Sequence, residues 1–301
     1  ANTNAQIVAP TGACPGTSVP FSSSKPSVTY HWDFNGVNVD QPISAMTPMA
    51  SGLPSLSWTC FMKDGANYYM FATNYGTGNI TRLNYGTSIY STPTVTALGS
   101  MGGTAPLTEC IDLAKDSVTG NWYGLVVNNS QMIVLSFGSS LSNTPTSTVN
   151  TYTQIRWAHQ VTIKRWHGSW HAFVANRNGG ITRFDFGSAL TNTPTITDLP
   201  MVGGIANPCN FTLYEQNDQW YMIVTNLINA NLTRLTFGTN LLNNTPTGTS
   251  ITPPAGMLNL PRTIFLLKDC MNHLLGYVIN ESGGVVKLNF GGNINATPTF
   301  T

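Results

Sequence analysis

Charged residues are scarce in this sequence: Asp, Glu, Lys and Arg make up only 8% of the 301 residues, where soluble proteins average about 25%. The formal net charge is +1, and the basic residues occur singly. Such a chain has no field to attract phosphates or an anionic membrane, so we expect no nucleic-acid partner. Long apolar runs are also missing, since stretches such as Thr263 to Leu267 are far too short to span a bilayer. We therefore expect no membrane insertion.

Cysteine and histidine are too few and too scattered to indicate a metal site. No CxxC pair occurs, which excludes the usual zinc motifs and a dense disulfide framework, although one or two disulfides stay open. His167 and His171 flank a short turn and have no third ligand nearby in the sequence. The five cysteines are Cys14, Cys60, Cys110, Cys209 and Cys270. We predict no metal and no cofactor.

Helical periodicity is absent as well, and the abundant residues are Asn, Thr, Ser and Gly. A surface wetted by amides and hydroxyls instead of charges is typical of extracellular β proteins. The sequence begins at Ala1 without Met, as a processed mature protein would. We therefore expect an all-β protein that is secreted or located at the cell surface.

A repeat of about fifty residues is the strongest pattern in the chain. An aromatic residue, usually followed by Gly, recurs at intervals of 49 to 53 residues. Its copies are Phe34, Tyr85, Phe137, Phe186, Phe237 and Phe290. A proline follows each one, at Pro42, Pro93, Pro145, Pro194, Pro246 and Pro298.

One copy of the repeat contains four short β-type runs separated by turn residues. They are Leu56 to Met62, Tyr68 to Thr73, Ile80 to Tyr85 and Thr94 to Leu98. Four strands in about fifty residues is the size of a propeller blade. We therefore predict a single β-propeller of four-stranded blades, with the first run of each copy nearest the ring axis.

The copy number predicts five blades, with six as the alternative. The first two runs occur five times, but the third occurs six times, because Tyr30 to Phe34 matches it near the N-terminus. The last copy ends just after its Thr-Pro, while Ile43 to Met49 supplies a fourth run with no first run before it. We expect these N- and C-terminal segments to meet in one blade, which removes two open sheet edges.

The division of the chain follows from this count. Residues 1–27 are an N-terminal extension, and residues 28–301 are the propeller. Its repeat units cover about 28–51 (partial), 52–106, 107–156, 157–208, 209–262 and 263–301 (partial).

The repeat resembles a known group. The segments NITRLNYGTSIYSTPTVTALGSMGG and GITRFDFGSALTNTPTITDLPMVGG are similar to repeats of secreted and cell-surface proteins of gliding-type bacteria, which are similar to NHL-type propellers. The opening CPGTSVPFSSSKPSVTYHWDFNG resembles the start of a PKD-like module. The resemblance implies adhesion or binding and carries no catalytic motif.

The residues at the start of the innermost runs differ from copy to copy, although the frame around them is kept. They are Trp58, Glu109, Trp157 with His159, Asn210 and Arg262. We predict that they form a ligand site at the mouth of the channel, where a Trp face meets a sugar ring and polar groups meet its hydroxyls. The alternative is that these side chains only plug the channel.

Two further sets of residues recur in the repeat. An Asn follows the second run in every copy, at Asn74, Asn128, Asn176, Asn226 and Asn280. We expect it to shape the following turn, with five equivalent lectin-type sites as the alternative. A basic residue recurs on the third run at Arg82, Arg183, Arg234 and Lys287, where we expect structural hydrogen bonds.

These patterns favour a secreted, non-enzymatic binding protein for adhesion or carbohydrate recognition, with a glycan or a surface protein as partner. A structural module of an extracellular filament, which implies self-assembly or a larger surface complex, is the second hypothesis. The third is a glycoside hydrolase, since five-bladed propellers of that class carry facing carboxylates on innermost strands. Only one copy supplies acids there, Glu109 and Asp112, so no catalytic pair is predicted.

Overall fold

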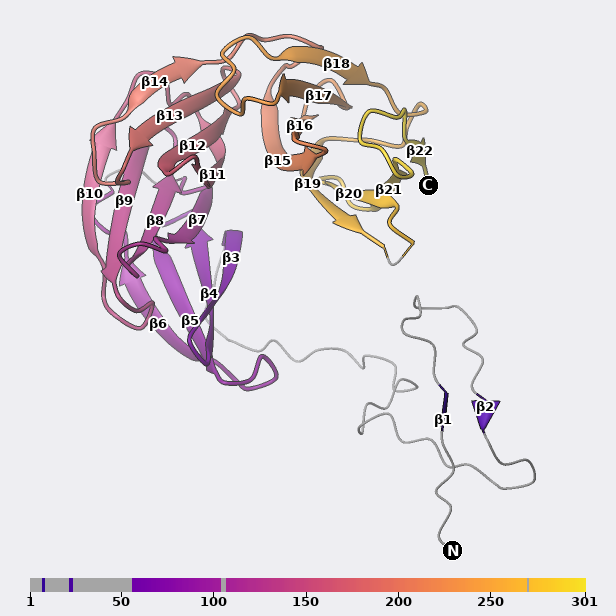
Figure 1. Ribbon diagram of the computed structural model, residues 1–301. Coiled ribbons are helices and arrows are strands. Elements are labelled where there is room, and N and C mark those ends of the chain that lie inside the picture. Colours follow the sequence, from indigo (N-terminus) through magenta and orange to yellow (C-terminus); the bar gives the residue numbers. More distant parts are fainter. Residues whose placement is uncertain (1–6, 9–21, 24–55, 104–106, 270) are drawn as a thin grey trace, which may run out of the picture.

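The computed structural model describes residues 7–8, 22–23, 56–103, 107–269 and 271–301 of the chain. Every regular element within these ranges is a β-strand, and they contain no helix that could cross a membrane. Five four-stranded antiparallel sheets follow one another around a ring (Figure 1). The prediction of an all-β, five-bladed β-propeller is confirmed.

Each blade is built from four strands that are consecutive in the sequence. The first blade contains β3 (Leu56–Asp64), β4 (Asn67–Asn74), β5 (Ile80–Gly86) and β6 (Thr94–Gly99). The second contains β7 (Cys110–Lys115), β8 (Trp122–Val127), β9 (Gln131–Gly138) and β10 (Thr146–Thr151). The third contains β11 (Ala158–Trp166), β12 (Ser169–Asn176), β13 (Ile181–Gly187) and β14 (Thr195–Asp198).

The last two blades follow the same plan. The fourth contains β15 (Pro208–Gln216), β16 (Gln219–Asn226), β17 (Asn231–Gly238) and β18 (Thr247–Ile251). The fifth contains β19 (Pro261–Lys268), β20 (Leu274–Asn280), β21 (Val285–Asn289) and β22 (Thr299–Phe300). Two short strands, β1 (Ile7–Val8) and β2 (Ser22–Ser23), pair with each other in a separate sheet.

The fifth blade differs from the expected exchange of terminal segments. Its fourth strand is β22 (Thr299–Phe300), which pairs with β21 through Leu288 and Asn289. The last copy therefore supplies its own fourth strand, although we expected it to lack one. The segments Tyr30 to Phe34 and Ile43 to Met49 lie outside the described residues.

The aromatic-Gly marker of the repeat has a structural cause. The aromatic ring ends the third strand of each blade and is buried, as at Phe137 (2% exposed). The following Gly138 has a φ of 68°, a left-handed conformation that side chains with a Cβ rarely adopt. The same positive φ occurs at Gly86, Gly187, Gly238 and Gly291. The chain thus needs Gly there to turn into the loop that precedes the fourth strand.

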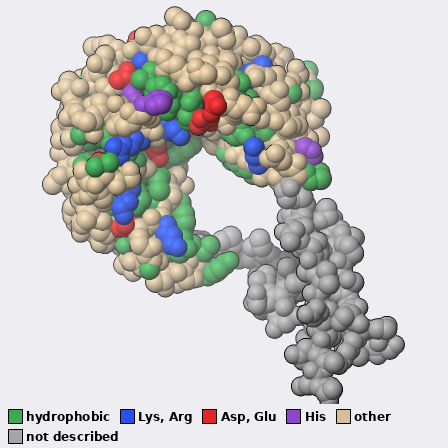
Figure 2. Space-filling model, viewed as in Figure 1, with side chains coloured by type: hydrophobic (Ala, Val, Ile, Leu, Met, Phe, Trp, Pro, Cys, Tyr) green, Lys and Arg blue, Asp and Glu red, His purple; other side chains and the backbone are tan. Residues whose placement is uncertain are grey.

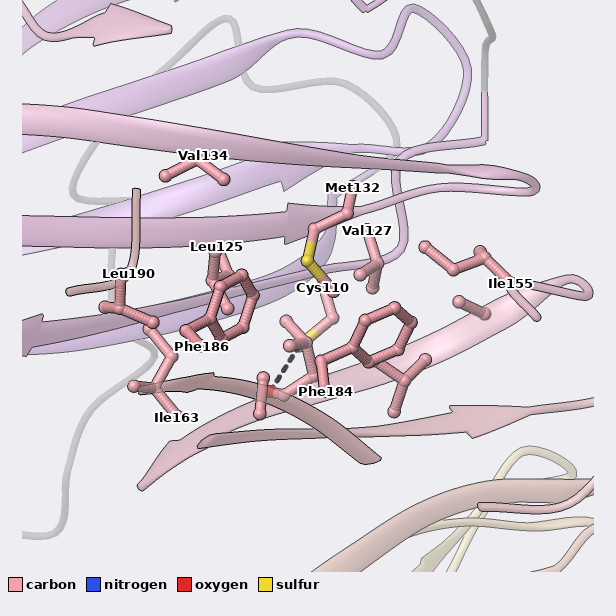
Figure 3. Close-up of a cluster of buried hydrophobic side chains, with 14 of the residues drawn as sticks. Cys110, Leu125, Val127, Met132, Val134, Ile155, Ile163, Phe184, Phe186 and Leu190 are labelled. Carbon is pink, nitrogen blue, oxygen red and sulfur yellow. Dashed lines mark hydrogen bonds between the residues drawn. The ribbon is translucent and has the colours of Figure 1, made fainter. Parts of the chain in front are cut away.

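The hydrophobic cores lie between neighbouring blades. Figure 3 shows the core between the second and third blades, where Leu125 and Met132 from one blade meet Phe184 and Phe186 from the next. Cys110 is fully buried there, and its thiol contacts the carbonyl of Val161 at 3.7 Å. Similar cores join the first blade to the second, the third to the fourth, and the fourth to the fifth. The second, third and fourth blades are therefore stabilised by neighbours on both sides, and the first and fifth by one described neighbour each.

A β-bulge marks the entry of the innermost strand in four blades. The register with the second strand shifts at Ser57, His159, Cys209 and Arg262, each of which is the unpaired residue of its bulge. Glu109 holds the same place in the second blade, directly before β7. Bulges turn a side chain away from the regular alternation and are common beside active sites. They place these five residues at one end of the ring.

Candidate functional site

A cavity of about 480 Å³ opens where the bulges lie, at one end of the ring. Four of the five residues at the bulge position line it. Figure 2 shows that basic and acidic side chains border the hollow of the ring in that view. Its lining residues are Leu56, Ser57, Tyr75, Glu109, Trp157, His159, Arg177, Arg262 and Glu281. The first, second, third and fifth blades contribute to this set, and the fourth does not.

Glu109 is the buried acid of the cavity, with 2% of its surface exposed. Arg262 on the fifth blade donates a hydrogen bond from Nη2 to its Oε2 over 2.9 Å. Burial raises the pKa of Glu109 above its ordinary value, and the positive charges of Arg262 and Arg177 offset only part of this rise. A carboxyl group that holds its proton longer than usual is suited to general acid catalysis.

His159 lies beside Glu109 and is buried to a similar degree. Burial, with Arg262 and Arg177 nearby, lowers its pKa to about 3, so the imidazole is neutral. The contact of its Nε2 with Glu109 Oε1 at 3.8 Å is therefore not an ion pair. Burial also raises the pKa of Cys209 to about 12, so this thiol keeps its proton and can donate it to His159 Nδ1 at 3.1 Å. This assigns the remaining ring hydrogen to Nε2, which has no partner.

Trp157 presents an aromatic ring to the cavity. The guanidinium of Arg177 lies over this ring, 4.5 Å from its centroid, and Arg177 forms no ion pair among the described residues. The indole Nε1 of Trp157 is buried and has no hydrogen-bond partner. Trp157, two residues before the bulge residue His159, has a positive φ of 55°. The residues two positions before the bulge residue in three other blades also have positive φ: Leu107, Asn207 and Leu260. The strain thus belongs to the repeat and not to Trp157 alone.

Glu281 supplies a second carboxylate to the cavity. Its Oε2 lies 3.6 Å from Arg262 Nη1, and half of its side chain is exposed. Arg262 therefore contacts two carboxylates at once, Glu109 with one terminal nitrogen and Glu281 with the other. This geometry limits the two carboxylate oxygens to a separation of about 9 Å at most, an upper limit that covers the spacings of both retaining and inverting glycosidases.

The sequence prediction missed Tyr75, Arg177 and Glu281. Each directly follows one of the repeated Asn residues, at Asn74, Asn176 and Asn280. Two of those Asn side chains hold the segment that leads into the innermost strand: Asn176 Oδ1 accepts the N–H of Arg156 (2.9 Å), and Asn280 Oδ1 accepts that of Asn259 (3.2 Å). In the sequence, these three lining residues could have been found as the residues that directly follow the repeated Asn.

The predicted site residues are only partly brought together. Glu109, Trp157, His159 and Arg262 line one cavity, whereas Trp58 and Asn210 line a second one of about 410 Å³ farther along the channel. They are one residue beyond the bulge, as their pairing with Thr73 and Thr225 shows. Asn210 Oδ1 accepts the N–H of Ile264 (3.0 Å), which joins the fourth blade to the fifth.

The repeated Asn residues are buried in all five blades, with exposures between 0 and 7%. Asn128 Oδ1, for example, accepts the N–H of Gln131 at 2.8 Å within its own turn. Side chains enclosed in this way do not present five open sugar sites.

No group of three or more potential metal ligands occurs in the described part of the chain. His171 instead contacts Asp185 through Nδ1 at 2.6 Å. Cys60, Cys110 and Cys209 are buried and form no disulfide. Cys14 and Cys270 lie outside the described residues.

The fold and the rim define a five-bladed propeller with a polar cavity at one mouth of its ring. Searches by sequence found no matching family model and no similar curated protein. In structure, the chain is similar to a thermostable family-43 glycoside hydrolase (TM-score 0.51, 8% identity, 82% of this chain and 93% of that one). It is also similar to an α-L-arabinofuranosidase from Podospora anserina in complex with cellotriose (0.50, 9%, 86% and 92%) and to RS223-β-xylosidase (0.50, 10%, 81% and 95%).

These neighbours correct one prediction. We expected a protein that is not an enzyme, because the sequence offers no catalytic carboxylate pair on its innermost strands. The structural neighbours named above are glycoside hydrolases, so the chain has a fold that enzymes use, which contradicts that expectation. The expectation considered acids on innermost strands only, whereas Glu281, the second acid that lines the cavity, follows a second strand. At 8 to 10% identity, the likeness itself shows the fold.

Proposed function

We propose that this protein is a glycoside hydrolase that uses Glu109 as the proton donor. The observation that carries the proposal is the bridge from Glu109 through Arg262 to Glu281, in a cavity on the axis of a five-bladed propeller. The fold shared with the glycoside hydrolases adds support, as does the raised pKa of Glu109.

In the proposed reaction, Glu109 donates its proton to the glycosidic oxygen as the bond to the anomeric carbon breaks. Glu281 accepts a proton from a water molecule whose oxygen attacks that carbon from the opposite face. The products are a sugar with inverted configuration and a free alcohol. The proposal requires the two carboxylates to lie near the upper limit of about 9 Å, because only that spacing leaves room for the water between them.

The remaining lining residues suit a sugar. The ring of Trp157 lines the cavity and, although Arg177 covers one of its faces, supplies an apolar contact for a pyranose or furanose. The unpaired N–H groups of Trp157 and His159 are donors without partners in a buried wall. A hydroxyl group that accepts from them would remove the cost of leaving these donors unsatisfied.

The test measures hydrolysis by the purified chain of aryl glycosides and of arabinose- and xylose-containing polysaccharides, the latter chosen from the names of the structural neighbours. We expect turnover that falls by about 10²-fold or more in Glu109→Gln, as loss of a general acid predicts. Glu215→Gln is the matched control, since Glu215 is an exposed acid at the opposite end of an innermost strand. Binding of glycans with no turnover of any substrate would refute the proposal.

A further inference from the structure

The described blades leave the ring open on one side. The innermost strands pack on one another from β3 through β7, β11 and β15 to β19, but β19 does not pack along β3. Figure 1 shows the break between the first and fifth blades, and Figure 2 shows the same opening with side chains present. We call the two blade faces that border it the seam.

The face of the fifth blade at the seam exposes apolar side chains that are buried in every other blade. Ile279 is 42% exposed and Val285 is 61% exposed. The residues equivalent to Ile279 in strand register, Thr73, Val127, Ala175 and Thr225, all have an exposure of 0%. Those equivalent to Val285 are Ile80, Met132, Ile181 and Leu232, with exposures of 0 or 1%. This face has the composition of a blade interface.

The face of the first blade shows the same defect. Phe61 is 50% exposed, whereas its equivalents in the second and third blades, Leu113 and Ile163, are 3% and 9% exposed, and those in the fourth and fifth blades are partly buried. Ile89, in the loop after the third strand, is 43% exposed. Its equivalents Leu141, Leu190, Leu241 and Ile294 all have an exposure of 0%.

A recurring aromatic contact also stops at the seam. Phe71 of the first blade packs on Phe137 of the second (ring centroids 5.3 Å apart), and Phe173 of the third on Phe237 of the fourth (6.1 Å). Tyr277 holds the corresponding place in the fifth blade, and no described blade follows it.

A recurring basic contact stops there too. Arg82 reaches the carbonyls of Leu141 and Asn143 in the next blade, at 2.8 and 2.7 Å. Arg234 reaches that of Ile294 at 2.8 Å in the same way. Lys287 is the fourth residue of this set, and it is exposed at the seam.

We propose that the N-terminal segment, residues 1–51, packs into the seam as a sixth blade. Its length is one period of the repeat, and Phe34 and Pro42 precede Tyr85 and Pro93 by 51 residues. In addition, β1 pairs with β2 through Ile7 and Ser23. In the first blade, 51 residues later, Trp58 pairs with Thr73. This pairing differs by one residue from the one that a shift of Ile7 and Ser23 by 51 residues would give. This inference does not rest on the proposed reaction, although a sixth blade would weaken the support that the five-bladed fold gives to that reaction.

The segment also carries the missing half of each contact. Phe34 is its copy of Phe137 and Phe237, so it meets Tyr277 across one border of the seam. His31 is its copy of Arg82 and supplies a basic group toward the first blade. No separate partner or second copy of the chain is required, because one repeat unit outside the described blades matches the one empty place.

Cross-linking tests this arrangement directly. In the full chain with Cys14→Ser and Cys270→Ser, a short bis-maleimide is applied to the Phe34→Cys, Tyr277→Cys pair. We expect cross-links within one chain, as efficient as those of the Phe71→Cys, Phe137→Cys pair. The Phe34→Cys, Val118→Cys pair is the mismatched control, because Val118 lies in an exposed turn of the second blade. Cross-links only between chains, or none while the Phe71 pair reacts, would overturn the proposal.

A second test measures the stability of the full chain, because a cysteine variant could change the labelling efficiency without reporting on the seam. A charge at Ile279 is buried if the segment covers it and solvated if the seam is open. We expect Ile279→Asp to lower the unfolding midpoint by roughly 5 °C or more, and Val118→Asp, at a 78% exposed residue, to leave it unchanged. Equal midpoints for the two variants would show an uncovered face and reject the sixth blade.

Discussion

Arg262 Nη2 lies 2.9 Å from Glu109 Oε2, although the two residues are 153 positions apart and belong to the fifth and second blades. The hydrogen bond therefore crosses the mouth of the ring instead of joining neighbouring blades. It places a fixed positive charge on the acid to which we assign proton donation. The first prediction follows from the removal of that charge.

Arg262→Gln is expected to move the alkaline limb of the pH profile of kcat/KM to higher pH. Arg262 holds down the pKa of Glu109 against the effect of burial, so its loss lets that pKa rise further. A proton donor is active while protonated, and activity is lost as the pH rises through its pKa. Arg156→Gln, which removes an exposed arginine paired with Asp198, is the control and should not move the limb. An unchanged limb in Arg262→Gln would mean that another group donates the proton.

Asp112 should contribute stability that is lost as the pH rises from about 4 to 6, against the opposite trend of the carboxyl groups whose pKa values are lowered. Burial raises the pKa of Asp112 from 3.8 to about 6, even though its oxygens accept the N–H groups of Ile163 and Leu113. The folded protein thus binds this proton more tightly than the unfolded chain does, and the stabilisation is lost as the pH passes the folded pKa. Asp112→Asn should remove this loss from the dependence of the urea midpoint on pH in this window. The two proteins keeping parallel profiles would contradict this assignment.

Arg82→Met is expected to cost about 2–4 kcal/mol of unfolding free energy. The guanidinium donates hydrogen bonds to three carbonyls of the next blade, and its loss leaves those buried or half-buried acceptors without a partner. Arg156→Met is the matched control, since an exposed ion pair contributes less than about 1 kcal/mol. Chemical denaturation of both variants measures the difference, and equal losses would show that the contact between blades is not stabilising.

Trp157→Ala should weaken glycan binding by about tenfold or more, because it removes both the apolar platform and an unpaired N–H donor from the cavity. Calorimetric titration of Glu109→Gln, with and without Trp157→Ala, separates binding from turnover. Tyr90→Ala removes an aromatic ring that is 89% exposed and outside the cavity, and it should bind like the parent. Equal affinities for all three proteins would place the sugar elsewhere.

The strand ends could be predicted from the sequence, whereas the residues that share the cavity could not. The four runs predicted for the first blade each match one strand, with ends that differ by two residues or fewer. Alternating side chains and turn residues are local signals, so they were readable directly. The bulges were not, because an extra residue in one strand is defined only by its partner strand. For that reason Trp58 and Asn210 were grouped with Glu109, one position out of register.

The second acid was hidden for a related reason. Glu281 follows an Asn that we expected to shape the next turn, whereas the Asn280 side chain bonds Met257 and Asn259, and the repeat pattern does not show on which side the next residue lies. Only the antiparallel pairing of β19 with β20 brings it back beside Arg262. A search restricted to innermost strands could not find the pair.

The sequence by itself determined the blade architecture of this protein, because the repeat encodes local strand and turn preferences in every copy, and the aromatic-Gly marker reports a backbone conformation that Gly adopts without strain. The tertiary structure decided the chemistry of the ring mouth. Glu109, His159 and Arg262 come from three blades, and their protonation depends on burial and on charges that meet only when those blades surround one axis. Such long-range electrostatic effects depend on distance in space, which the order of residues does not contain.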